Sequence, residues 1–255
     1  MIRSVFRAIR TFQKLILLEI LCKRLIIKYC LGISLQAMDT SHVALVSLNL
    51  SSEGFEDYRC DQPVVLGINI ANISKVMKLA DPQDSITLQA DQDPSTLKIK
   101  FENQKSGRTT EFALNLITLD VEHLSIPDTE YTSIITINSS EFSKICKELQ
   151  QLSDGLTIQT KQDEVYLQVE GPAGSGQIKL ASNESDRKED QTIIEVEQPV
   201  TQQFALNYLN LFNKASNLSS FTRLCLHQEQ PLVTEFKIES LGVLKYYLAP
   251  KISDE

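Results

Sequence analysis

Apolar and polar residues alternate in short runs along most of this chain. Residues 43–50 read VALVSLNL, and residues 96–101 read TLKIKF. Alternation with a period of two, bounded by Asp, Asn, Gly or Pro, is typical of half-buried antiparallel strands. The turn signals DQDP (91–94) and QEQP (228–231) each separate two such runs. The same pattern predicts further strands at residues 85–89, 133–137, 156–160, 165–169, 193–196, 221–226 and 232–238.

A few segments show helical spacing instead. In one of them Ile73, Val76 and Ala80 fall on a single face, which predicts one buried stripe. In another, Ser139 or Ser140 can cap the helix start. The fold class is therefore predicted to be α+β, with more strand than helix. The predicted helices span residues 72–80, 140–152, 207–215 and about 7–21.

The order of these elements repeats along the chain. An apolar segment, a short Lys-bearing helix, a strand, a polar turn and a second strand occupy residues 67–101, and the same order returns at 204–238. Residues 119–130 lie between them, are acidic, and indicate an extended connector. A chain of 255 residues is also long enough for two domains. We predict an N-terminal domain (1–116), a connector (117–132) and a C-terminal domain (133–255).

Charge is distributed unevenly along the chain. Residues 3–28 carry seven basic residues against Glu19, a sum of +6, so the rest must sum to −8 − 6 = −14. The predicted helices lean basic through Lys75, Lys78 and Lys214, whereas residues 140–152 are balanced. Lysines of this kind often only solvate the outer face of a helix. If the helices share one surface, that surface is positive and suits phosphate contact without sequence preference.

Enzyme and metal chemistry find little support in the sequence. His42, His123 and His227 stand alone, and no Walker A, G-x-S-x-G or G-x-G-x-x-G pattern occurs. Asp120 and Glu122 sit in the predicted connector without a partner. We therefore expect no enzymatic activity, no cofactor and no metal. The five scattered cysteines indicate reduced thiols of the cytosol or nucleus.

Four stretches of the chain are distinctive: LQAMDTSHVAL (35–45), SEGFEDYRCD (52–61), LDVEHLSIP (119–127) and LKYYLAPKI (244–252). They resemble the proliferating cell nuclear antigen family, the eukaryotic DNA sliding clamps. The resemblance runs in order from about residue 32 to the C-terminus. Residues 1–31 depart from it, through divergence or through an error of reading frame or gene model. The basic first 18 residues also resemble an organelle transit peptide.

The resemblance implies a homotrimeric ring in the nucleus that encircles double-stranded DNA without reading its sequence. Each subunit would contribute two similar clamp domains, with antiparallel sheets outside and helices lining the pore. The ring would act as a processivity factor that tethers DNA polymerase, clamp loader, flap endonuclease and ligase-type proteins. The DNA-facing residues implied are Lys14, Lys75, Lys78, Lys144, Lys147 and Lys214.

Three further sites follow from the same resemblance. A hydrophobic pocket would receive a short partner motif ending in paired aromatics, and two edge strands would join the subunits. The family's ubiquitin- and SUMO-acceptor lysine falls at Gln162 in a gapless alignment, and a small local shift would place it at Lys161, the candidate modification site. The pocket residues are Met38, His42, Val43, Leu45, Leu124, Ile126, Pro127, Pro231, Tyr247, Ala249, Pro250 and Ile252. The subunit-interface residues are Glu111, Phe112, Leu114, Leu116, Ser175, Gly176, Ile178 and Leu180.

Two alternatives remain within this reading of the sequence. A subunit of a checkpoint-type clamp would enter a hetero-oligomeric ring and would associate poorly with itself. A degenerate clamp paralogue, altered in its N-terminal segment, is the other.

Overall fold

The protein is described by a computed structural model covering residues 4–9, 24–29, 32–91, 94–118, 130–183 and 191–251. For residues 4–9 and 24–29 only the backbone is described. The chain divides into two compact units. The first unit comprises Met1–Thr40, Val46–Ser125 and Ile238–Leu244, and the second comprises Ser41–Leu45, Ile126–Lys237 and Lys245–Glu255.

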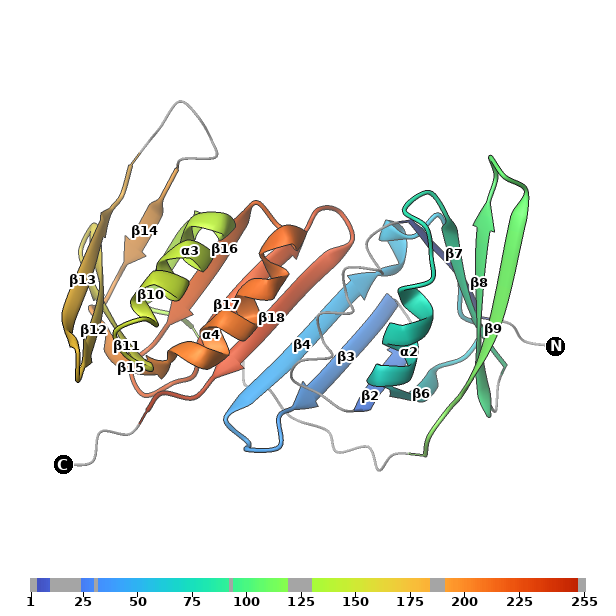
Figure 1. The fold of residues 1–255 in the computed structure, drawn as a ribbon, viewed down its shortest axis with the longest axis horizontal. Coiled ribbons are helices and arrows are strands. Elements are labelled where there is room, and N and C mark those ends of the chain that lie inside the picture. Colours follow the sequence, from blue (N-terminus) through green and yellow to red (C-terminus); the bar gives the residue numbers. More distant parts are fainter. Residues whose placement is uncertain are drawn as a thin grey trace. The chain divides into compact units, whose positions relative to one another are not determined.

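The described residues of the first half of the chain build two groups of hydrogen-bonded strands and one helix (Figure 1). One group has the order β5-β1-β7-β8-β9, and the other has the order β6-β2-β3-β4. The strands are β1 (Ser4–Ile9), β2 (Arg24–Tyr29), β3 (Gly32–Met38), β4 (Ala44–Ser51), β5 (Asp57–Arg59), β6 (Val64–Asn69), β7 (Ser85–Ala90), β8 (Thr96–Asn103) and β9 (Arg108–Asn115), with the 3-10 turn η2 (Ser52–Gly54) and helix α2 (Ile70–Met77).

The second half of the chain has the same construction. Its strand orders are β14-β10-β16-β17-β18 and β13-β12-β11-β15. The strands are β10 (Ser133–Asn138), β11 (Gly155–Lys161), β12 (Glu164–Gly171), β13 (Gly174–Ala181), β14 (Ile193–Val196), β15 (Thr201–Ala205), β16 (Phe221–Leu226), β17 (Leu232–Ile238) and β18 (Gly242–Leu248), with helices α3 (Ser139–Leu149) and α4 (Leu206–Phe212) and the 3-10 segment η4 (Asn213–Leu218).

The predicted repeat is confirmed in the order of elements, and it recurs once more than predicted. A strand, a helix and three strands follow one another as β6-α2-β7-β8-β9, as β10-α3-β11-β12-β13 and as β15-α4-β16-β17-β18. In the second unit, the first strand of each repeat pairs in the sheet of the other. Strand β10 pairs with β16, and β15 pairs with β11. The two repeats of this unit therefore exchange their first strands.

Two predictions about helix starts are wrong. Residues 7–9, where a fourth helix was predicted to begin, belong to β1, which pairs with β5 and β7. Helix α3 is capped by Asn138, whose side chain accepts hydrogen bonds from the backbone N–H groups of Ser140 and Glu141. The Ser139 hydroxyl is buried instead, where it accepts a hydrogen bond from Thr222. The exposed side chain of Ser140 does not provide the observed cap.

In the second unit, α3 and α4 lie side by side on one face of the sheet that contains β16, β17 and β18 (Figure 1). The ring of Phe212 in α4 stacks on Tyr246 of β18 at 4.5 Å, and Phe236 meets the same tyrosine edge-on. All three side chains are buried. Aromatic packing of this kind adds to hydrophobic burial and fixes α4 on this face of the sheet, which we call the inner face; the opposite face is the outer face.

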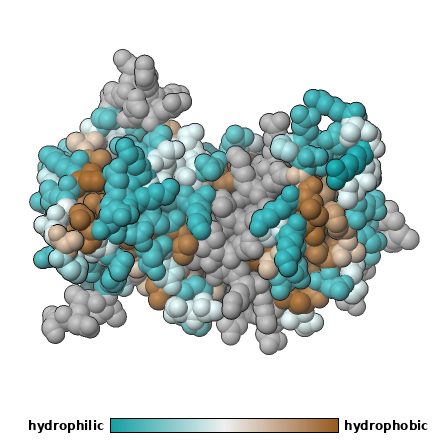
Figure 2. Space-filling model, viewed as in Figure 1, coloured by the Kyte–Doolittle hydropathy of each residue, from teal (hydrophilic) through white to brown (hydrophobic). Residues whose placement is uncertain are grey.

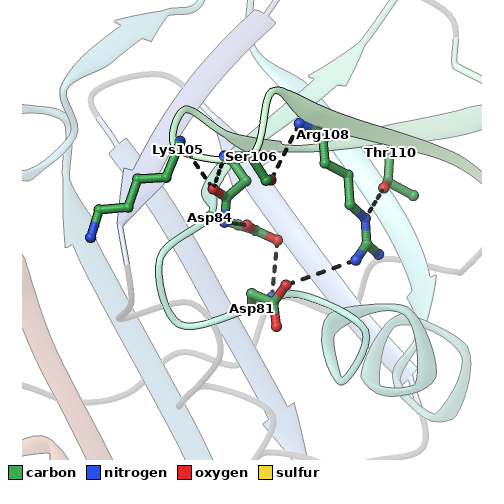
Figure 3. A network of polar contacts seen from close by, with 7 residues as sticks. Asp81, Asp84, Lys105, Ser106, Arg108 and Thr110 are labelled. Atoms are coloured by element: carbon green, nitrogen blue, oxygen red, sulfur yellow. Dashed lines mark hydrogen bonds and ion pairs between the residues drawn. The ribbon is translucent and has the colours of Figure 1, made fainter.

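In the first unit, polar contacts connect the loop after α2 with the β8–β9 turn (Figure 3). The buried Asp84 carboxylate accepts hydrogen bonds from the Asp81 N–H and from the Asn103 side chain, each at 2.9 Å. The Asn103 oxygen also accepts from the backbone of Lys105 and Ser106. These contacts hold the C-terminal end of α2 against the hairpin that continues into β9.

Candidate functional site

Exposed lysines lie on the described helices of both units. Lys75 is in the last turn of α2 and Lys78 is its C-cap residue, while Ser74 and Met77 on the opposite side are buried. A cation near a helix C-terminus is also favoured by the helix dipole. The spacing that buries one face of α2 therefore presents both ammonium groups to solvent, as the sequence predicted.

A polar groove accompanies the basic residues of the second unit. It has a volume of about 500 Å³ and lies between α3 and η4, with Lys144, Lys147, Glu148 and Ser216 among its lining residues. The Lys144 ammonium is 3.8 Å from the Glu148 carboxylate, so part of the positive charge of α3 is balanced. Figure 2 shows hydrophilic side chains over the exposed faces of α3 and α4.

Lys214 is exposed on η4, next to the buried Asn213 and Ala215. Lys144, Lys147 and Lys214 thus share the helical layer of the second unit, while Lys75 and Lys78 belong to the first. Lys14, the remaining predicted DNA-facing residue, lies outside the described residues.

Among the described residues, seven predicted pocket residues belong to the second unit, and hydrogen bonds bring their segments together. The Ala249 N–H donates to the Val43 carbonyl at 3.0 Å. Strand β15 joins the other segments, since Gln202 donates to the Gln230 carbonyl and Lys251 donates to the Gln203 carbonyl. The seven residues are His42, Val43, Leu45, Pro231, Tyr247, Ala249 and Pro250.

The exposure of these residues suits a contact surface. Val43, Leu45, Tyr247, Ala249 and Pro250 are half-buried, and His42 and Pro231 are exposed. The backbone of His42 has φ 57°, a left-handed conformation that is uncommon for a residue with a side chain and is frequent at binding sites.

The other predicted pocket residues are not brought into this group by the described structure. Met38 is half-buried at the end of β3 and belongs to the first unit. Leu124, Ile126, Pro127 and Ile252 lie outside the described residues, as does most of the predicted connector.

Tyr131 is a member of this region that the sequence analysis missed. Burial raises the pKa of its hydroxyl to about 12, with smaller contributions from Tyr247, Cys225 and Glu235. The tyrosine therefore lies close to Tyr247 and over the outer face of β16. A single Tyr before a strand has no sequence signal that separates a surface role from a core role.

The alkaline stability of the protein should report this environment. A tyrosine titrates near pH 10 when unfolded, so the unfolded state loses the Tyr131 proton first. Stability that is fully present below about pH 10 should then be lost as pH rises toward 12. We expect Tyr131→Phe to reduce this alkaline loss, measured by urea denaturation at a series of pH values. Equal losses in both proteins would contradict the assignment.

The predicted interface residues lie on strands that end their sheets. Strand β9 is last in β5-β1-β7-β8-β9, and β13 is first in β13-β12-β11-β15. Phe112 and Leu114 of β9 and Ile178 and Leu180 of β13 are half-buried, and they alternate with exposed residues. An edge strand of this kind presents unpaired backbone N–H and C=O groups together with partly exposed apolar side chains.

The remaining interface residues adjoin these edges. Glu111 and Ser175 are exposed, and Leu116, just beyond β9, donates its N–H to the Ser95 carbonyl. Gly176 permits a close approach of the turn after α3, because a Cβ there would lie 3.1 Å from the Leu152 side chain and 3.9 Å from that of Leu149, the last residue of α3. The edge strand β13 is thus packed directly against the C-terminal end of α3.

Lys161 is the last residue of β11 and is exposed at the β11–β12 turn. It lies opposite Glu164 in the strand register, so Gln162 and Asp163 form the turn. Its ammonium group lies 4.8 Å from the centre of the Tyr166 ring. The side chain is accessible to a modifying enzyme, and modification at this position stays a prediction.

The described part of the chain carries no membrane-spanning helix and no metal-binding cluster of His, Cys, Asp and Glu residues. No helix there is long and apolar enough to cross a membrane. No group of three or more His, Cys, Asp or Glu residues in that part of the chain could hold a metal ion. Cys146 and Cys225 are buried free thiols.

Comparison with protein families agrees with the fold. Residues 23–123 match the proliferating cell nuclear antigen N-terminal domain, and residues 125–251 match its C-terminal domain. Two such clamp domains in one chain, built mostly of antiparallel sheets with few helices, define the class of DNA sliding clamps. The chain belongs to the proliferating cell nuclear antigen family. Both the predicted family and the predicted fold class are confirmed. The family's general role is DNA binding together with interaction with replication and repair proteins.

Proposed function

We propose that this chain is the subunit of a homotrimeric ring that encircles duplex DNA in the nucleus and acts as a processivity factor. The observation that carries the proposal is the pair of open sheet edges, β9 in the first unit and β13 in the second. One chain that offers two different apolar edges can join copies head to tail. Such a heterologous contact closes into a ring when the rotation per subunit allows it.

The charge of the helices supports DNA as the threaded molecule. The lysine-bearing helical segments of the described residues carry only one or two lysines each. Those exposed to solvent include Lys75, Lys78, Lys147 and Lys214. Sparse ammonium groups give weak, salt-sensitive phosphate contacts, with dissociation constants on the order of 10⁻⁴ to 10⁻⁶ M. Weak contacts permit sliding, so retention on DNA comes from ring closure. This role requires no catalytic group.

The surface that contains Val43, Tyr247 and Pro250 is the proposed docking site for the tethered proteins. Half-buried apolar side chains around a tyrosine suit an aromatic plug, the kind of contact that dominates interface energies. DNA polymerase, clamp loader, flap endonuclease and ligase-type proteins that carry such a motif are the proposed partners.

The mass of the purified chain in solution tests the ring. Light scattering should give about 86 kDa (3 × 28.7 kDa) for the trimer. Ile178→Asp should reduce the mass to that of a monomer, because it places a carboxylate in the apolar edge of β13. Gln177→Asp, on the exposed face of the same strand, is the matched control and should remain trimeric. A monomeric wild-type chain would contradict the homotrimer and favour the checkpoint-type hetero-oligomeric clamp.

A further inference from the structure

The outer face of the second unit's sheet carries two adjacent rows of side chains. On β16, Arg223 and Cys225 face the same way, because residues two apart in a strand share a face. The strand register places Arg223 opposite Glu235 and Cys225 opposite Val233 of β17. One row therefore contains Arg223 and Glu235, and the neighbouring row contains Cys225 and Val233.

Strand β18 continues both rows. Lys245 and Tyr247 alternate with the buried residues Leu244, Tyr246 and Leu248, so they face outward together. The Lys245 ammonium lies 3.2 Å from the Glu235 carboxylate and extends the charged row. Tyr247 belongs to the docking surface. The cationic row therefore lies two residues along each strand from that surface, a distance of about 7 Å.

The charged and polar groups that shift the pKa values of Tyr131 and Cys225 agree with this arrangement of the two rows. The pKa of Tyr131 is affected by Tyr247, Cys225 and Glu235. The pKa of the Cys225 thiol, which burial raises to about 11, is also affected by Arg223, Glu235 and Lys245. Cys225 therefore lies near both the charged row and Tyr131.

The charge of this row is not balanced within the row. The row contains two cations and one carboxylate: Lys245 pairs with Glu235, and Arg223 lies opposite Glu235 in the strand register. The side chains of Glu235 and Lys245 are 17% and 38% exposed, and Arg223 is also exposed to solvent. The row therefore carries a net charge of +1 that is open to solvent beside an apolar docking surface.

We propose that Arg223 and Lys245 form a cationic rim of the docking surface and bind an acidic side chain of the partner segment next to its aromatic plug. This inference rests on the proposed docking function. A protein segment fits better than nucleic acid, because the Glu235 carboxylate between the two cations repels a polyanion. Nucleic acid is also assigned to the helical face, and these residues point away from the buried side of the sheet that contacts α4.

Two short synthetic peptides would test the rim by fluorescence anisotropy. Both end in paired phenylalanines, and their flanking residues are aspartates in one peptide and alanines in the other. Arg223→Ala should weaken binding of the acidic peptide about threefold and leave the alanine peptide unchanged, since exposed ion pairs contribute modestly. Glu235→Gln should strengthen binding of the acidic peptide by a similar factor. Lys237→Ala, an exposed cation two residues along β17, is the control and should change neither.

The outcomes separate the two levels of the proposal. If Arg223→Ala weakens binding of both peptides equally, or changes the binding of neither, the proposed cationic rim is wrong and the docking surface is not contradicted. If neither peptide binds the wild-type chain, the docking surface itself is wrong, and the rim falls with it. Arg223→Glu should reverse the preference and favour a peptide with lysine flanks, an effect that a purely structural role would not produce.

Discussion

Replacing Lys75 and Lys78 by alanine should weaken DNA binding about tenfold and leave the trimer intact. Both lysines are exposed on α2, so their removal costs no core packing. Each lost phosphate contact should lower the slope of log affinity against log salt by about 0.9. Titration of a short labelled duplex at several salt concentrations measures the affinity and the slope together.

The double variant Lys98→Ala/Lys237→Ala is the matched control. It removes the same charge, but from exposed positions on strands β8 and β17. We expect its salt slope to equal that of the wild type. An equal loss in both double variants would mean that net charge alone governs DNA binding, and the helical face would lose its assigned role.

Replacing Tyr247 by alanine should cost about 1–3 kcal/mol of partner-peptide binding, a 5- to 150-fold loss of affinity. The half-buried ring lies on the outer face of β18 near Tyr131, so truncation removes apolar area that a peptide would cover. Isothermal titration calorimetry with a peptide ending in paired aromatics measures the effect.

Tyr208→Ala is a suitable control for this prediction. Tyr208 is also half-buried, but it lies on α4 near Phe212, on the helical face of the second unit. Its replacement should leave the peptide affinity unchanged. Unaltered peptide affinity of the Tyr247→Ala variant would contradict the proposed position of the docking site.

The strands were the most predictable part of the fold. Residues 193–196 and 232–238 coincide with β14 and β17, because one face of each strand is buried and the other contains exposed polar residues such as Glu195 and Lys237. Strand β1 could not be predicted from its own residues. Its conformation is fixed by pairing with β5 and β7, which are distant in sequence. The helix predicted over about residues 7–21 therefore began too early, since residues 7–9 belong to β1.

The candidate site was predictable to different degrees for physical reasons. Helical spacing alone places Lys75 and Lys78 on the solvent side of α2. In contrast, Tyr247 and Tyr131 have a composition that fits a core equally well, and only strand alternation and neighbouring residues place them on the outer face. The edge strands β9 and β13 were found through the family resemblance, because no local pattern states which strand ends a sheet.

The exchange of first strands within the second unit has a consequence for how that unit folds. Cutting the chain between β13 and β14 would separate β10 from β16 and β15 from β11, leaving each fragment with one orphaned strand and one incomplete sheet. Neither fragment could close its own hydrophobic layer. The two fragments should therefore stay unfolded apart and regain structure only when mixed, so the duplicated halves behave as one cooperative body.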